Sequence, residues 1–269
     1  MRTPDGAATV LAEVRGTRIE AEAWGPGADR ALDGLPALLG LLDDPTGFDP
    51  TGHPVVADLA RRRPDLRIGW TSAVFEALFP AILEQKVTGG EAAIALRGLT
   101  QMYGEPAPGP IAAQLRLRLQ PAPEQLASLP YYAFHPFGVE QRRAEIIGRA
   151  ARDVAQFNGL ADLPGTRAEV GAIAAAVVQV YAGIGAWTAA EVTFRALGDP
   201  DAVSVGDFHL KNLVSFVLAQ EARGSDERMV ELLAPWRGHR ARVIRLFELS
   251  GITAPRFGPR YTPLDRRGM

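Results

Sequence analysis

An uncharged stretch from Val170 to Ala190 constrains the fold of this chain more than any other feature. Gly183-Ile184-Gly185 interrupts the stretch, and a second apolar segment runs from Ala186 to Leu197. Glycine lacks a Cβ atom, so it permits the sharp turn that two closely joined helices require. The pattern predicts a helix-hairpin-helix, whose second helix begins with N–H groups and the positive end of its dipole facing outward. Such a helix start can bind a nucleic-acid phosphate without reading a base sequence.

The same stretch is about long enough to span a bilayer, which makes a membrane helix the alternative. Gln179 and the two glycines interrupt it, and no basic anchors flank it. We therefore expect a buried helix followed by a hairpin, with no membrane partner. Residues Met1 to Gly6 have no apolar signal-peptide core behind them, so a cytoplasmic location is expected, at the nucleoid if the source is bacterial.

The composition indicates a globular chain that can bury a sizeable core. Its 269 residues are 47% hydrophobic and 22% charged, which suits one large domain or two lobes. Cysteine is absent, which excludes disulfides, thiolate chemistry and cysteine-ligated iron–sulfur clusters. The histidines lack paired metal-ligand spacing, so no side-chain metal site is expected; they are His53, His135, His209 and His239.

The overall charge is unusual for a nucleic-acid-binding protein. The net charge is −2 and the isoelectric point is about 6.1. Arginines are nevertheless concentrated from Arg237 to the end of the chain, and a local patch can steer association even when the total charge is near neutral. The alternative is a solvated arginine face with no nucleic-acid role.

Periodicity predicts a mainly helical chain behind one short β-hairpin. Val10–Val14 and Ile19–Ala23 alternate apolar and polar residues around a glycine-containing turn. Helices are expected over residues 28–42, 55–63, 72–83, 91–103, 121–130, 141–157, 167–180, 186–197, 208–218, 226–233 and 236–249. Pro80 should kink or restart its helix, and Thr166 with Glu169 forms a capping box. The tail after residue 254 is expected at the surface or loose.

Four motifs follow one another along the chain: Gly183-Ile184-Gly185, Trp187-Thr188-Ala189, Arg195-Ala196-Leu197-Gly198-Asp199-Pro200 and Val205-Gly206-Asp207. This ordered series resembles the helix-hairpin-helix/Gly-Pro-Asp superfamily of DNA glycosylases. Within it, the chain is most similar to the 3-methyladenine DNA glycosylase II branch, over about residues 41–249. The resemblance implies an α+β, two-lobed helical fold with an N-terminal antiparallel sheet. That sheet is expected to be short here, because few residues precede Leu41.

The resemblance also predicts how the chain is divided. Residues 1–44 would form the hairpin and one helix, a remnant of the N-terminal sheet domain, and residues 45–269 the helical body. Lobe one would cover about 73–199, including the hairpin at 170–197. Lobe two would combine 45–72 with 200–269, and the active site would lie between the lobes.

Asp207 stands where the family carries its catalytic aspartate. The resemblance implies that its carboxylate stabilises positive charge on the deoxyribose and orients or deprotonates the attacking water. The alternative is that Asp207 is an N-cap for the helix predicted at 208–218, because aspartate is a preferred capping residue. Both roles are compatible, since a capping carboxylate stays ionised.

The base pocket would be formed by Trp187, Glu191 and Tyr132. Trp187 occupies the position where lyases of the superfamily carry a lysine, and an indole cannot form the imine intermediate. The resemblance therefore implies a monofunctional enzyme that uses water, with the indole facing a cationic methylated base.

Core positions are the alternative for Trp187 and Tyr132. Glu191 replaces a family tyrosine, and either favours another lesion or faces solvent. Arg245 falls near a family tryptophan.

Several residues are predicted to contact DNA. Gln85 and Lys86 stand where the family inserts a wedge beside the flipped base, with an ordinary exposed lysine as the alternative. The hairpin would hold phosphates through Gly183, Gly185, Ala186 and Thr188. Further cationic candidates are Lys211, Arg142, Arg143 and Arg237.

The predicted function is monofunctional excision of an alkylated purine from double-stranded DNA, by a monomer, leaving an abasic site. The alternative is a non-catalytic helix-hairpin-helix protein that binds DNA or recognises damage. No organic cofactor or iron–sulfur cluster is expected. Because relatives hold a monovalent cation on hairpin carbonyls, the resemblance implies a structural Na⁺ or K⁺ there.

Overall fold

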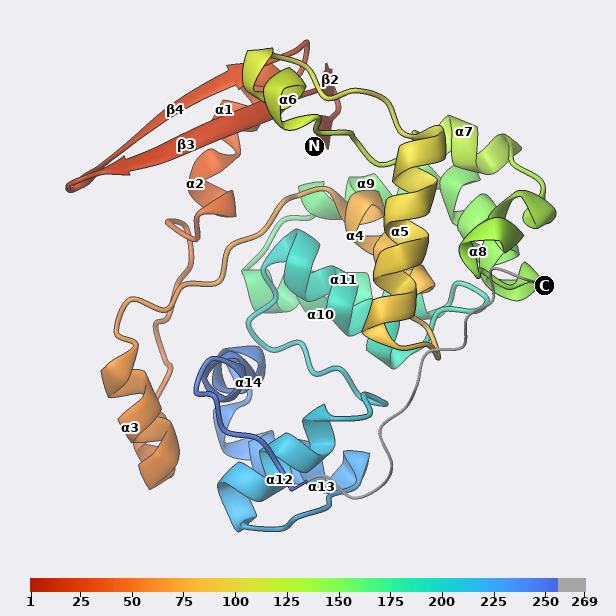
Figure 1. Cartoon of the computed structure of the whole chain (residues 1–269). Coiled ribbons are helices and arrows are strands. Elements are labelled where there is room, and N and C mark those ends of the chain that lie inside the picture. The colour runs from red at the N-terminus through yellow and green to blue at the C-terminus, as the bar shows by residue number, and fades with distance from the viewer. Residues whose placement is uncertain (256–269) are drawn as a thin grey trace. The chain divides into compact units, whose positions relative to one another are not determined.

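The computed structural model describes residues 1–255 and divides them into two compact units. Unit 1 contains residues 1–38 and 72–162, and unit 2 contains residues 39–71 and 163–255. Most of the described chain is helical, and its strands form two small antiparallel sheets (Figure 1). The predicted mainly α fold with a short N-terminal β region is therefore confirmed.

The β region belongs to unit 1. Strand β1 (Arg2–Thr3) pairs with β2 (Gly6–Ala7), and β3 (Thr9–Arg15) pairs with β4 (Arg18–Trp24). The second pair is the predicted hairpin, with Thr9 opposite Trp24 and Arg15 opposite Arg18. The single helix predicted at 28–42 is wrong. The structure has α1 (Ala28–Asp33) and α2 (Leu35–Leu38), because Pro36 has no N–H with which to continue the hydrogen bonds of α1.

The rest of unit 1 is helical. Its elements are α4 (Val74–Leu83), α5 (Gly89–Tyr103), α6 (Pro110–Leu115), α7 (Pro123–Ser128), the 3₁₀ helix η2 (Tyr131–Phe137), α8 (Gln141–Arg152), α9 (Val154–Asn158) and η3 (Gly159–Asp162). The pattern missed α6 and η2, and the helix predicted at 141–157 is divided at Asp153. The expected restart at Pro80 does not occur, since α4 continues through it. Pro80 has no N–H to donate to the carbonyl of Glu76, four residues earlier. The side-chain amide of Gln120 donates to this carbonyl instead, at 3.3 Å.

Unit 2 contains the hairpin and the C-terminal helices. Its elements are η1 (Pro50–Gly52), α3 (Pro54–Arg62), α10 (Arg167–Gln179), α11 (Ala186–Leu197), α12 (Leu210–Ala219), α13 (Asp226–Leu233), η4 (Ala234–Trp236) and α14 (Arg240–Glu248). Thr166 and Glu169 form the predicted capping box of α10. The predicted lobe boundary at about residue 199 differs from the structure, because the α10–α11 hairpin lies in the same unit as residues 200–255. None of the helices within residues 1–255 is both long and apolar enough to cross a membrane.

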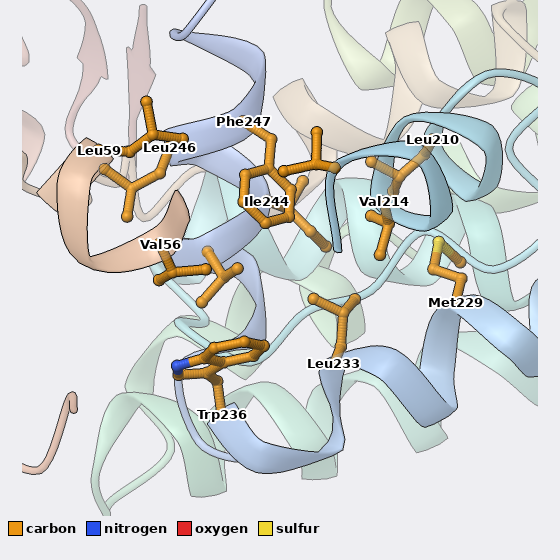
Figure 2. Close-up of a cluster of buried hydrophobic side chains, with 12 residues drawn as sticks. Val56, Leu59, Leu210, Val214, Met229, Leu233, Trp236, Ile244, Leu246 and Phe247 are labelled. Carbon is orange, nitrogen blue, oxygen red and sulfur yellow. The ribbon is translucent and has the colours of Figure 1, made fainter. Parts of the chain in front are cut away.

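The core of unit 2 joins helices from both ends of its sequence. Figure 2 shows apolar side chains converging from α3, α12, α13 and α14. They include Val56, Val214, Leu233 and Phe247, all completely buried. Trp236 closes the cluster, and its indole N–H donates to the carbonyl of Asp49 at 2.9 Å. The core thereby fixes α12 and α14, whose neighbouring residues form the candidate site.

Two arginines at the start of the C-terminal run, Arg240 and Arg242, form ion pairs within unit 2. Arg242 is 2% exposed and forms a double hydrogen bond with Asp43, both N–O distances being 2.8 Å. Arg240 binds both oxygens of Asp201, at 2.8 and 2.6 Å. The other two arginines in this part of the described chain, Arg237 and Arg245, are exposed. The predicted patch is therefore not a row of solvated arginines up to residue 255, and the remaining arginines, like the predicted loose tail, lie outside the described residues.

Candidate active site

The hairpin has the predicted form. Helix α10 ends at Gln179, and Gly183 then takes a φ of +95°, a conformation that a residue with a Cβ rarely adopts. Helix α11 begins at Ala186, and Gly185 at its N-cap has no side chain with which to cap it. Gly185 and Ala186 are exposed. The start of α11 is therefore accessible to an anion, which its amides and dipole would favour.

The side chain of Thr188 is buried at the hairpin. Thr188 is 2% exposed and packs inward with Ala189 and Val192. It is the third residue of α11, so its predicted contact with a phosphate would be through the backbone N–H in the first turn of the helix.

Asp207 precedes α12, and protein donors hold both of its carboxylate oxygens. Oδ1 accepts the backbone N–H groups of His209 and Leu210 at 2.7 and 2.8 Å. Helix α12 begins at Leu210 rather than at the predicted 208, so Asp207 satisfies the first amides of the helix from a position before its N-cap. The capping and catalytic interpretations thus describe the same carboxylate.

The second oxygen of Asp207 contacts Trp187, a bond that no feature of the sequence predicts. The indole Nε1–H donates to Oδ2 at 3.2 Å. Helix α11 therefore orients a side chain on the loop before α12. Trp187 is half-buried, so it is neither a fully buried core residue nor a fully exposed one.

Asp207 and Glu191 line the same pocket of about 520 Å³. All of its lining residues belong to unit 2: Glu191, Phe194, Arg195, Ala202, Ser204, Asp207, His209, Leu210, Leu213, Ala241, Ile244, Arg245 and Glu248. Trp187 is not part of this lining, so its contact with the site is through the carboxylate of Asp207.

The other charges of the pocket are paired. Glu191 accepts the hydroxyl of Ser204 through Oε1 and the guanidinium of Arg195 through Oε2, both at 2.6 Å. Arg245 donates to Glu248 at 2.6 Å, and its guanidinium carbon lies 5.7 Å from the centroid of the Phe194 ring. Glu191 therefore lines the pocket, and Arg195 balances its charge.

The loop before Asp207 is anchored to two helices. Asp199 is 5% exposed and accepts the N–H of Asp201 at 2.9 Å and the hydroxyl of Thr193 at 3.2 Å. Burial raises the pKa of Asp199 to about 6, and these hydrogen bonds oppose the shift. Asp201 in turn accepts the N–H groups of Gly238 and Arg240, which fixes the loop to the start of α14.

Two of the predicted cationic contacts have protein partners in the fold. Lys211 donates to Asp226 at 3.3 Å. Arg143 is 4% exposed and donates to the carbonyl of Leu83 at 2.7 Å, so it satisfies the end of α4 and is unavailable to a phosphate. Arg142 and Arg237 are exposed, as a phosphate contact requires.

The predicted wedge and Tyr132 belong to unit 1. Lys86 is exposed, with a φ of +54° in the turn between α4 and α5, and Gln85 is half-buried beside it. A positive φ at a non-glycine residue is uncommon and often marks a functional turn. Tyr132 is 63% exposed and packs edge-on against Tyr131, with ring centroids 5.8 Å apart. It is a surface residue of η2, not a core aromatic.

Within residues 1–255 no three histidine, aspartate or glutamate side chains gather as a metal site.

Comparison with known proteins identifies the fold. No protein-family model matches the chain, and no curated protein matches its sequence. Solved structures do. A 3-methyladenine DNA glycosylase from Archaeoglobus fulgidus has a TM-score of 0.73 at 20% identity, over 94% of this chain and 87% of that one. An 8-oxoguanine glycosylase/lyase from Clostridium acetobutylicum has a TM-score of 0.63 at 10% identity, over 92% and 87%. A Schizosaccharomyces pombe 3-methyladenine DNA glycosylase, solved with abasic DNA, has a TM-score of 0.53 at 16% identity, over 84% and 100%.

Proposed function

We propose that this chain, which has the fold of the helix-hairpin-helix DNA glycosylases, is a monofunctional DNA glycosylase that removes an alkylated purine from double-stranded DNA. The observation that carries the proposal is the placement of Asp207. Its carboxylate is held by three protein donors at the edge of a pocket, on the loop that follows an accessible hairpin. The fold alone would not identify a reaction.

The arrangement suits hydrolysis of an N-glycosidic bond. As the bond between C1′ and the base nitrogen breaks, its electron pair leaves with the base and positive charge builds on the deoxyribose. A carboxylate fixed beside the sugar stabilises this charge without having to reorganise. Water then adds to C1′, and Asp207 can accept its proton. The product is an abasic site.

Trp187 favours a hydrolytic reaction over a lyase reaction. A lyase needs an amine that attacks C1′ to form an imine, and an indole has none. In this structure the indole N–H donates to the carboxylate instead. It therefore assists Asp207 and does not compete with water for the sugar.

The pocket supports a purine carrying positive charge. Its volume of about 520 Å³ lies within the range of about 300–1,000 Å³ typical of small-molecule sites. Its lining contains three carboxylates, those of Asp207, Glu191 and Glu248, and two guanidinium groups, those of Arg195 and Arg245, so one negative charge is left unbalanced. A purine alkylated at N3 or N7 bears a positive charge that this excess of negative charge attracts, and it leaves as a neutral base once the glycosidic bond breaks.

The proposal needs no organic cofactor. The family's Na⁺ or K⁺ would bind backbone carbonyls of the hairpin between Tyr181 and Gly185. The carbonyls of Tyr181 and Gly185 accept the N–H groups of Ile184 and Ala189, and a carbonyl oxygen has two lone pairs, so such a bond does not prevent it from binding a cation. The hairpin offers no side-chain carboxylate, so its donor set fits a weakly held monovalent ion.

A base-release assay tests the proposal. Duplexes with one 7-methylguanine, hypoxanthine, ethenoadenine or 8-oxoguanine, and an undamaged duplex, are incubated with the protein and divided into samples with and without hot alkali. We expect strand breaks in the methylated duplex only after alkali, because an abasic site is left intact. Breaks without alkali would indicate a lyase. If none of the lesions is released, the non-catalytic DNA-binding alternative is favoured.

A substitution that adds a negative charge at the start of α11 tests the predicted phosphate-binding site independently of base release. Gly185→Asp should lower affinity for DNA about tenfold, because a carboxylate would both occupy the amides of α11 and repel a phosphate. The backbone at Gly185 is extended and a Cβ there meets nothing within 4 Å, so the variant should fold. Binding is measured by fluorescence anisotropy at fixed salt. Gly185→Asn adds the cap without the charge and should cost less, so equal losses would contradict the electrostatic explanation.

A further inference from the structure

We propose that Asp226, at the start of α13, is a positioning residue that holds the backbone on both sides of Asp207. This inference rests on the proposed function. Asp226 Oδ1 accepts the N–H of Gly206 at 3.0 Å, and Oδ2 accepts the ammonium of Lys211 at 3.3 Å. One carboxylate thereby links the residue immediately before Asp207 to the first turn of α12, just after it.

The residue before Asp207 needs such an anchor. Gly206 is exposed and has a φ of +97°, so neither burial nor its own conformational preference holds the chain there. A Cβ at this position would meet only Trp187, at 3.9 Å, so packing does not define its place. The hydrogen bond to Asp226 is the tertiary contact that supplies the missing restraint.

The bonds to Asp207 itself do not make Asp226 redundant. Oδ1 binds amides of the same short segment, those of His209 and Leu210, so that part of the network moves with the loop. The Trp187 bond connects the carboxylate to α11 but is the longest of the three, at 3.2 Å. Asp226 connects the same loop to a third helix, α13, which is fixed in the core through Met229 and Leu233.

The position of the carboxylate relative to the sugar sets its effect on the reaction. A displacement of about 1 Å at a catalytic group can cost about 100-fold in rate. Removing Asp226 should therefore slow the chemical step and leave DNA binding largely intact, since neither Gly206 nor Asp226 belongs to the exposed start of α11.

The test compares Asp226→Ala with Glu227→Ala, which removes the neighbouring carboxylate from the same first turn of α13. Glu227 is exposed. In single-turnover base release, Asp226→Ala should be about 10- to 100-fold slower than wild type, with an unchanged Kd for abasic DNA, while Glu227→Ala should match wild type. Asp226→Asn should recover most of the rate, because its amide oxygen can still accept the Gly206 N–H.

Amide hydrogen exchange gives a second readout that does not depend on activity. Asp226→Ala should speed exchange at Gly206, His209 and Leu210, whereas Glu227→Ala should not. Unchanged exchange at these amides would overturn the inference, and so would equal rates of base release in the two alanine variants. If Asp226→Asn were as slow as Asp226→Ala, the charged pair with Lys211 rather than the Gly206 bond would be responsible, which overturns the claim that Asp226 holds the residue before Asp207. Absence of base release by the wild-type protein contradicts the proposed function instead, and the exchange result still decides whether Asp226 holds the loop.

Discussion

Replacing Asp207 by asparagine is expected to slow base release by about 100- to 1,000-fold. Removal of one preorganised electrostatic group from an active site has effects of about this size. Asparagine is neutral, so it can neither balance the charge that develops on the deoxyribose nor accept a proton from water. Single-turnover release of 7-methylguanine, at saturating protein, measures the chemical step directly.

The variant should remain folded and should still bind DNA. The asparagine Oδ1 can accept the N–H groups of His209 and Leu210 as the carboxylate does. Its amide nitrogen would meet the indole N–H of Trp187, so that one bond is lost or the amide turns. The melting temperature and the affinity for abasic DNA serve as controls. A release rate within about threefold of wild type, with both controls unchanged, would assign the chemistry to another residue.

The local parts of the fold were predictable from the sequence. The β3–β4 hairpin, the capping box of α10 and the glycine turn before α11 each depend on residues close together in the chain. Their signals are periodicity, capping chemistry and glycine, which act within a few residues. The position of Asp207 beyond the hairpin came from the resemblance, since its spacing alone has no structural meaning.

The tertiary partners of the candidate residues could not be predicted from the sequence. Arg143, Lys211 and Thr188 have residue types that suit a phosphate contact, and in the fold their side chains also contact the end of α4, Asp226 and the interior. The bond from Trp187 to Asp207 joins residues 20 positions apart on different elements. Nothing in the local pattern encodes such a pair, because it depends on how α11 packs against the loop before α12.

The same limit applies to Arg242, which sequence alone placed in a basic run and the structure places in a buried ion pair. Arg242→Leu is expected to lower the free energy of unfolding by about 3–5 kcal/mol, because it leaves the carboxylate of Asp43 buried without its partner. The two side chains are 2% and 5% exposed, and their double hydrogen bond connects α14 to a segment 199 residues earlier in the chain.

A double-mutant cycle measures the interaction energy between Asp43 and Arg242 separately from the effect of removing either side chain alone. Asp43→Leu combined with Arg242→Leu should recover most of the lost stability, since apolar replacement of both members of a buried pair is often close to neutral. Arg245→Leu is the matched control on the same helix. Its pair with Glu248 is 46% and 41% exposed and should contribute no more than about 1 kcal/mol.

Urea unfolding followed by tryptophan fluorescence reports mainly on unit 2, which contains Trp70, Trp187 and Trp236. Ile244 and Arg245 of α14 line the pocket, so loosening this helix should also weaken base release in the Arg242 variant. If Arg242→Leu costs no more than Arg245→Leu, the buried pair does not hold α14, and the pocket wall depends on the apolar contacts of Phe247 and its neighbours instead.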